Sequence, residues 1–157
     1  MTALGAFRDD FYNAVNVLIN GQFNSTSQAS GVLAASVLAG ATENYVSSSG
    51  ATALTLDSTV NIIAQLQQAV ATAYKAAINA AGAGVNPPSG VPNLFNVAFY
   101  VAIRNTNAGT LTLTLGAGQT LGNGVLTIAT GVERQYLFTV TSPTTILIND
   151  LGGSTVT

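Results

Sequence analysis

The sequence lacks two residue types on which much protein chemistry depends. It contains no cysteine and no histidine among its 157 residues. Their absence excludes disulfides, Ser-His-Asp and Cys-His catalytic centres, and zinc sites built from imidazole or thiolate ligands. Stability must therefore come from packing or from association with other chains.

Charged residues are also scarce. They make up 6% of the sequence, against roughly 25% in an ordinary soluble domain. The surface must then consist largely of neutral residues, which pack against another protein without the desolvation cost of buried charge. This composition indicates a chain that functions inside an assembly.

The cations are too few for a nucleic-acid partner. They are Arg8, Lys75, Arg104 and Arg134, and the net charge is −2, so no basic stripe can neutralise a phosphate backbone. No apolar run approaches the ~20 residues that a membrane-spanning helix needs. We also see no signal peptide and therefore expect no membrane partner.

The acids offer little material for an active site. They are Asp9, Asp10, Glu43, Asp57, Glu133 and Asp150. A glycosidase pair about 5 to 9 Å apart could still assemble from distant positions, but neighbours such as Asp9 and Asp10 diverge on a helix. No calcium-loop pattern is present. We expect a protein without enzymatic activity, cofactor, metal or small-molecule substrate, with Glu133 and Arg134 in a solvated turn or an inter-subunit pair.

A glycine-rich stretch, GAGQTLGNG at residues 116–124, could suggest a phosphate loop. However, Leu121 stands where a dinucleotide-binding loop has its third glycine, and the following VLTIA favours a strand rather than a helix. We therefore expect a turn region between strands, with glycine supplying positive φ.

The N-terminal stretch predicts a helical arm. Leu4, Phe7, Phe11 and Leu18 repeat at helical spacing, and the polar residues 22–30 read as a linker. We assign residues 1–30 to an arm and linker. The stripe that contains Phe7, Phe11 and Leu18 either packs on its own domain or contacts a partner, because periodicity cannot say whose core it joins.

The remaining residues, 31–157, predict a β-rich domain with one long helix. A short helical turn and a strand near residues 42–47 come first, and a helix follows at about 58–81, capped by Asp57 or Ser58. Its predicted buried face includes Val60, Ile63 and Leu66.

From residue 94 the apolar period changes to two, as expected for strands. The residues predicted to point inward are Val97, Phe99, Val101, Ile103, Leu111, Leu113, Leu115, Tyr136, Phe138, Val140, Ile146 and Ile148. Short strands joined by turn signals favour a mainly β fold, an antiparallel β-sandwich or jelly-roll-like module.

Three residues of the first long strand region are candidates for partner binding. Phe95 and Tyr100 lie off the main apolar face, which makes them candidates for a subunit contact. Arg104 is either a charge at the edge of a contact with no role in binding, or a residue whose planar guanidinium pairs with a partner's carboxylate.

Residues 51–149 resemble a module of tailed-bacteriophage virion proteins, notably head decoration or cement proteins. The resemblance rests on TLD followed by STVNIIAQL, on AFYVAIRNTNAGTLTLTLGAGQTL, and on GVERQYLFTVTSPTTILI. It implies a non-enzymatic homotrimer, made in the host cytoplasm, that binds the outer surface of the capsid and bridges major capsid protein subunits. A tail-fibre or receptor-binding module, and a minor shell protein, remain open as alternatives.

Overall fold

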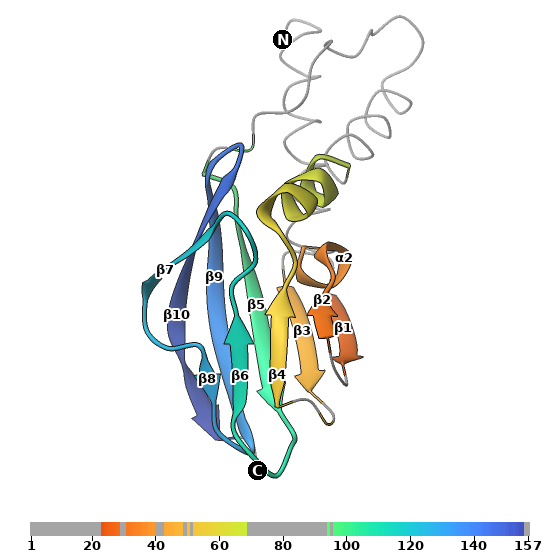
Figure 1. Cartoon of the computed structure of the whole chain (residues 1–157), viewed down its shortest axis with the longest axis vertical. Coiled ribbons are helices and arrows are strands. Elements are labelled where there is room, and N and C mark those ends of the chain that lie inside the picture. Colours follow the sequence, from red (N-terminus) through yellow and green to blue (C-terminus); the bar gives the residue numbers. More distant parts are fainter. Residues whose placement is uncertain are drawn as a thin grey trace, which may run out of the picture.

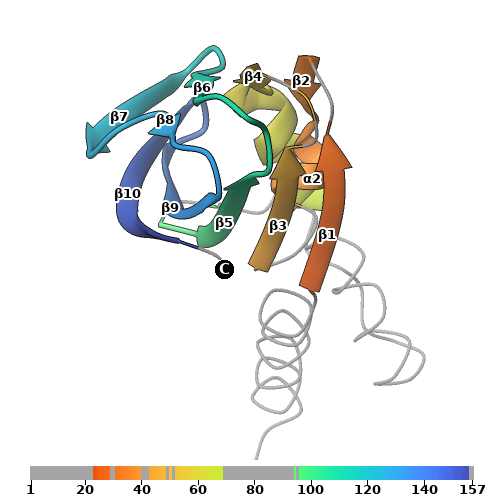
Figure 2. The ribbon, with the colours of Figure 1, turned by 90° about the horizontal axis from the view of Figure 1, so that it is seen from below.

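The computed structural model describes residues 23–28, 31–39, 43–48, 50, 52–68, 94 and 96–155. Within these residues the chain is mainly β, with ten strands in two mixed sheets (Figure 1). One sheet has the strand order β1-β3-β5-β9-β10-β7, and the other has the order β2-β4-β6-β8. The sheets face each other, with β5, β9 and β10 forming one wall and β4, β6 and β8 the opposite wall (Figure 2).

The longest strands are β9 and β10, with eleven residues each. Their bounds are β1 Phe23–Gln28, β2 Gly31–Leu33, β3 Glu43–Ser48, β4 Ala53–Leu56, β5 Ala98–Asn105, β6 Leu111–Thr114, β7 Gln119–Asn123, β8 Thr127–Ile128, β9 Val132–Ser142 and β10 Thr145–Thr155. A short helix, α2, spans Ala35–Leu38. Residues 59–68 are also helical and lie at the end of the sandwich toward which β4 and β6 run (Figure 1).

The first six strands alternate between the two sheets. β1, β3 and β5 pair in parallel in one sheet, and β2, β4 and β6 pair in parallel in the other. Each passage from one sheet to the other and back therefore adds one layer, which we call a rung: β1–β2, β3–β4 and β5–β6. The prediction of an antiparallel sandwich is wrong for this half, because strands that return by way of the opposite sheet run in the same direction.

The last strands change the pairing. β9 lies antiparallel to β5 and to β10, and β8 lies antiparallel to β6. β7 is parallel to β10. Because an antiparallel strand reverses the chain direction, the pairing of β9 with β5 and of β8 with β6 ends the parallel stacking on this side.

The predicted inward residues form the core between the sheets. Phe99 and Phe138 pair across β5 and β9 with their rings 5.2 Å apart and stacked. Other predicted inward residues are buried, among them Val101, Ile103, Leu111, Leu113, Tyr136, Val140, Ile146 and Ile148, whereas Val97 and Leu115 are half-buried. The period-two prediction is confirmed for the buried residues.

The helix at residues 59–68 begins as predicted but faces the core differently. The Ser58 hydroxyl accepts a hydrogen bond from the Asn61 backbone N–H, which makes Ser58 the N-cap. Thr59, Ile62, Ile63 and Leu66 form the buried stripe, whereas Val60 is 63% exposed. The predicted inward place of Val60 is wrong, because the stripe starts one residue earlier, at the buried Thr59.

Two other predictions require correction. Phe23–Gln28, expected to be part of a linker, forms strand β1 and pairs with β3; its polar sequence gave no apolar alternation to detect. Gln119–Asn123, expected within a turn, forms strand β7 beside β10. The predicted arm, at residues 1–22, and the helix prediction beyond residue 68 lie outside the described residues.

The glycine-rich stretch has structural reasons for its glycines. Gly118 and Gly124 have φ values of 80° and 83°, which favour glycine. A side chain at Gly116 would collide with the backbone of Leu56 and Asp57, so this glycine allows close approach of the β4 end. The stretch therefore turns and packs the chain.

Candidate protein-contact face

The side of β5, β9 and β10 that points away from the core carries an unusual set of side chains. We call it the outer face, and its residues are Ala98, Tyr100, Ala102, Arg104, Glu133, Gln135, Leu137, Thr139, Leu147 and Asn149. These positions alternate with the buried residues of the same strands. The outer face is therefore positioned by the same pattern that builds the core.

An aromatic and an aliphatic side chain lie together in the middle of this face. Tyr100 is 46% exposed, and its direct cross-strand neighbour is the half-buried Leu137. Leu147 pairs with Thr139 on the next strand and is also half-buried. Aromatic residues are enriched and charged residues are depleted in the centres of protein interfaces, so this composition suits a protein contact.

Arg104 and Glu133 lie opposite each other at one end of the outer face. Both are half-buried, yet no ion pair joins them: the ion pair that the described residues contain is between Arg134 and Asp150. The Arg104 Nε atom is buried without a hydrogen-bond partner within the described residues. The outer face thus holds one cation and one anion that are not committed to each other.

The predicted partner-binding residues fall into two groups. Tyr100 and Arg104 lie on the same face of β5. Phe7, Phe11, Leu18 and Phe95 lie outside the described residues. Sequence reasoning missed the juxtaposition of Arg104 with Glu133, because the register between β5 and β9 has no local signal in either segment.

Three polar clusters join separate elements of the β frame by hydrogen bonds. In the first, Asp57 accepts hydrogen bonds from the backbone N–H groups of Ala35 and Ser58, at 2.9 and 2.7 Å, and from the Asn61 side-chain amide at 2.8 Å. Burial raises the pKa of Asp57, but these hydrogen bonds outweigh it and leave the pKa below its ordinary value. Asp57 thereby joins α2, the end of β4 and the helix at residues 59–68.

The Asp57 cluster also reaches β7. The Gln119 side-chain amide donates to the Asp57 backbone carbonyl at 2.6 Å, and its oxygen accepts from the Gly116 backbone N–H at 2.8 Å. Gln119 is buried. The connection between β6 and β7 is therefore fixed to the end of β4 by both ends of one side chain.

The second cluster surrounds Asn105, which is fully buried at the end of β5. Its side-chain amide donates to the carbonyls of Gly109 and Ile128, at 2.7 and 2.8 Å, and its side-chain oxygen accepts from the Asn107 backbone N–H at 2.9 Å. The Asn105 side chain thus satisfies groups of the β5–β6 loop and of β8, which belongs to the opposite sheet.

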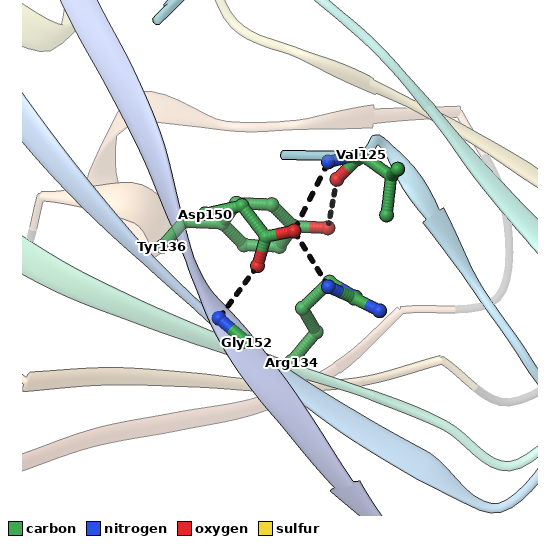
Figure 3. A network of polar contacts seen from close by, with 5 residues as sticks. All are labelled: Val125, Arg134, Tyr136, Asp150 and Gly152. Atoms are coloured by element: carbon green, nitrogen blue, oxygen red, sulfur yellow. Dashed lines mark hydrogen bonds and ion pairs between the residues drawn. The ribbon is translucent and has the colours of Figure 1, made fainter. Parts of the chain in front are cut away.

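The third cluster is centred on Asp150, in the middle of β10 (Figure 3). Its carboxylate accepts from the Val125 and Gly152 backbone N–H groups, at 3.0 and 2.8 Å, and pairs with Arg134 at 2.5 Å. Burial raises the pKa of Asp150, but the two N–H groups and the Arg134 guanidinium outweigh it and lower the pKa below its ordinary value. The β7–β8 connection is therefore fastened to the β9–β10 hairpin.

Tyr136 completes this third cluster. Its ring is buried in the core and its hydroxyl donates to the Val125 carbonyl at 3.2 Å. Burial and the nearby Asp150 carboxylate raise the pKa of Tyr136. Glu133 and Arg134 lie in strand β9, and Arg134 pairs with Asp150, so the predicted solvated turn at these two residues is wrong.

Neither a chemical centre among the described residues nor a known relative assigns a function to this chain. Within the described residues, no group of three or more His, Cys, Asp or Glu side chains is placed to hold a metal ion. In the same part of the chain, no helix is long and apolar enough to span a bilayer. No protein-family model, curated protein or solved structure matches the chain.

Proposed function

We propose that this chain is a structural virion protein of a tailed bacteriophage, a decoration or cement protein that binds the outer surface of the capsid and bridges major capsid protein subunits. The role is non-enzymatic. The observation that carries the proposal is the outer face, where Tyr100 and Leu137 form a neutral contact surface on the β frame. The motif resemblance of residues 51–149 supports it.

The physical demands on a cement protein match this frame. A protein that stabilises a lattice must resist deformation, and the Asp57, Asn105 and Asp150 clusters join separate elements by hydrogen bonds. It must also bury surface against neighbours at little cost. A sequence with 6% charged residues does so, because few charges need to be desolvated.

The proposal assigns different contacts to the two parts of the chain. The outer face, with Tyr100 and Arg104, contacts other copies of the chain, and the stripe of Phe7, Phe11 and Leu18 contacts the capsid. The resemblance implies a homotrimer, and the two-fold pair of copies argued below is the alternative to it. A deletion that tests the arm must stop at residue 22, because residues 23–28 form a strand of the six-stranded sheet.

Deletion of residues 1–22 should leave the β sandwich folded and weaken attachment to the capsid. The expected result is an unchanged far-ultraviolet circular dichroism signal of the strands and a reduced number of copies bound per head. A truncated chain that decorates heads as tightly as the full chain would show that the arm does not attach the protein.

The proposal is tested by co-sedimentation of the purified chain with undecorated heads and, separately, with tails of the virus that encodes it. Saturable binding to heads, at a copy number set by the capsid lattice, is the expected result. Binding to tails alone, or to neither particle, would refute the decoration function.

One observation favours a second candidate, a tail-fibre or receptor-binding module. The rungs β1–β2, β3–β4 and β5–β6 stack in parallel, and stacked parallel rungs are the building principle of elongated β-solenoids. A fibre module that recognises a receptor should bind tails in the same sedimentation experiment and retain specific glycans on an array.

A further inference from the structure

We propose that two copies of this chain associate through their outer faces, related by a two-fold axis that runs along the strands between β5 and β9. The inference does not depend on the virion function proposed above. It rests on the register of one strand pair and on the side chains that this register places opposite each other.

The register of β5 and β9 determines which residues meet across such an axis. The two strands are antiparallel, and Tyr100 lies opposite Leu137 just as Arg104 lies opposite Glu133. A two-fold axis that runs along the strands, above the line between β5 and β9, places the outer face of a second copy against that of the first. In this arrangement β5 of one copy lies over β9 of the other. Tyr100 of one copy then lies over the partner's Leu137, and the reverse contact forms at the same time.

The same rotation matches the charges. Arg104 of one copy comes to lie over the partner's Glu133, and Glu133 comes to lie over the partner's Arg104. Within one copy the two residues form no ion pair, and the Arg104 Nε is buried without a partner among the described residues. A second copy therefore provides two ion pairs of opposite polarity, side by side at one end of the face, next to the apolar contact of Tyr100 with Leu137.

At the other positions of β5 and β9, the rotation places a small side chain of one copy against a larger side chain of the partner. The rotation brings Ala98 over the partner's Thr139 and Ala102 over the partner's Gln135. Alanine opposite a larger residue lets the two sheets approach without collision. The strands of the two copies then run in nearly the same direction, as in the aligned packing of sheets.

The size of the face sets the expected strength of the contact. From Ala98 to Arg104 the face is about 20 Å long, and its three neighbouring strands span about 14 Å. This is on the order of 300 Å² per copy in projection, which is below the size of a standard stable interface and corresponds to a weak, transient contact. We therefore expect a reversible dimer with a Kd in the micromolar range, roughly 1 to 100 μM.

No other surface of the described residues offers a comparable arrangement. The remaining exposed large apolar residues are Val32, Val60, Val125 and Leu151. They belong to four different segments of the chain. Scattered single apolar residues are normal on protein surfaces, whereas Tyr100 and Leu137 are direct neighbours.

Sedimentation equilibrium of the full chain with two charge reversals tests the inference. Arg104→Glu gives the face two negative charges and Glu133→Arg gives it two positive charges. Each variant alone should associate at least about tenfold more weakly than the wild type, because like charges then meet across the axis. An equimolar mixture of the two variants should form a heterodimer, since both contacts become attractive.

The mixture distinguishes an intermolecular contact from a structural role within one copy. Reversal of an internal pair would weaken both variants, but mixing two damaged chains would not restore association. Thr112→Glu serves as a matched control, because it adds a carboxylate at an exposed position of β6 in the opposite sheet and should leave the dimer unchanged. Tyr100→Ser tests the apolar contact independently and should weaken the dimer.

Three results would overturn the inference. The first is a wild type that stays at the monomer mass of 15.8 kDa up to about 500 μM, well above the expected Kd. The second is a trimer in place of the dimer. A dimer that neither charge reversal weakens would have the same meaning. The third is a mixture of the two variants that remains as dissociated as each variant alone.

Discussion

The inner and outer faces of β5 and β9 differ in burial, although they belong to the same two strands. On the inner face, Phe99 and Phe138 are fully buried and stacked. On the outer face of the same strands, Tyr100 is 46% exposed beside Leu137. Because side chains alternate along a strand, two strands perform two tasks: the inner residues stabilise the fold and the outer residues are available for recognition.

The difference teaches where a change in sequence should affect folding and where it should affect association. Inner residues contact others on all sides, so their loss leaves a cavity. Outer residues end in solvent in a single copy, so their loss removes little stability. Substitutions on the two faces should therefore separate the two properties.

The largest expected effect comes from two neighbouring residues of β5. Phe99→Ala should lower the free energy of unfolding by about 3–5 kcal/mol, because it empties the centre of the core. Tyr100→Ala should lower it by about 1 kcal/mol or less. Urea denaturation, at a protein concentration too low for association, measures both. Equal losses for the two variants would contradict the division between the faces.

The next effect extends the comparison to a buried polar residue. Asn105→Ala should lower the free energy of unfolding by about 2–4 kcal/mol, because it leaves the carbonyls of Gly109 and Ile128 without their donor. The same denaturation experiment applies. Asn123→Ala, at an exposed position of β7, is the control and should cost about 0.5 kcal/mol or less. A similar cost for both variants would mean that Asn105 does not hold the two sheets together.

A smaller effect depends on pH. The pKa of Asp150 in the folded chain lies below its ordinary value of 3.8, so its stabilising effect is complete above that value and is lost as pH falls through the folded pKa. Asp150→Asn should lower the free energy of unfolding by about 2 kcal/mol at neutral pH, through its bonds to Arg134 and Val125.

The thermal midpoint, measured from neutral pH to about pH 2, checks this sign. The wild-type midpoint should fall more steeply than that of Asp150→Asn below about pH 4. The variant should keep a residual decrease, because Asp57 also has a lowered pKa. Parallel curves for wild type and variant would show that the Asp150 carboxylate does not stabilise the fold.

The smallest expected effect is an increase in the free energy of unfolding. The Thr59 hydroxyl is fully buried and has no hydrogen-bond partner among the described residues. Thr59→Val should therefore raise the free energy of unfolding by up to about 1 kcal/mol, since it replaces an unsatisfied polar atom by a methyl group. Thr59→Ser keeps the hydroxyl and should lose about 1 kcal/mol. If valine is the more damaging substitution, the hydroxyl has a partner in solution.

The sequence predicted what local periodicity can reveal. The inward places of Phe99 and Phe138 and the outward place of Tyr100 follow from alternation within a single strand. The helix start at Ser58 follows from its capping hydroxyl. These features depend on neighbours in the chain, which the sequence displays directly.

Pairings between distant segments could not be predicted in the same way. The parallel partner of β3 is β5, and Glu43 pairs with Tyr100 across an intervening segment that includes a helix. Strand β1 is polar and has no alternating pattern. The opposition of Arg104 and Glu133 depends on the register of β5 and β9, which the packing of the core determines. The candidate contact face could therefore be identified only in the structure. Tyr100 and Arg104, two of its residues, were already predicted from the sequence as candidates for partner binding.

The central proposal, that this chain is a capsid-bound structural protein of a tailed bacteriophage, is tested most directly by electron cryomicroscopy of the phage particles that the proposal implies. The account predicts density for the β sandwich on the outside of the capsid at every equivalent lattice site. Particles whose heads lack this density, or that carry it only in the tail, would contradict the account.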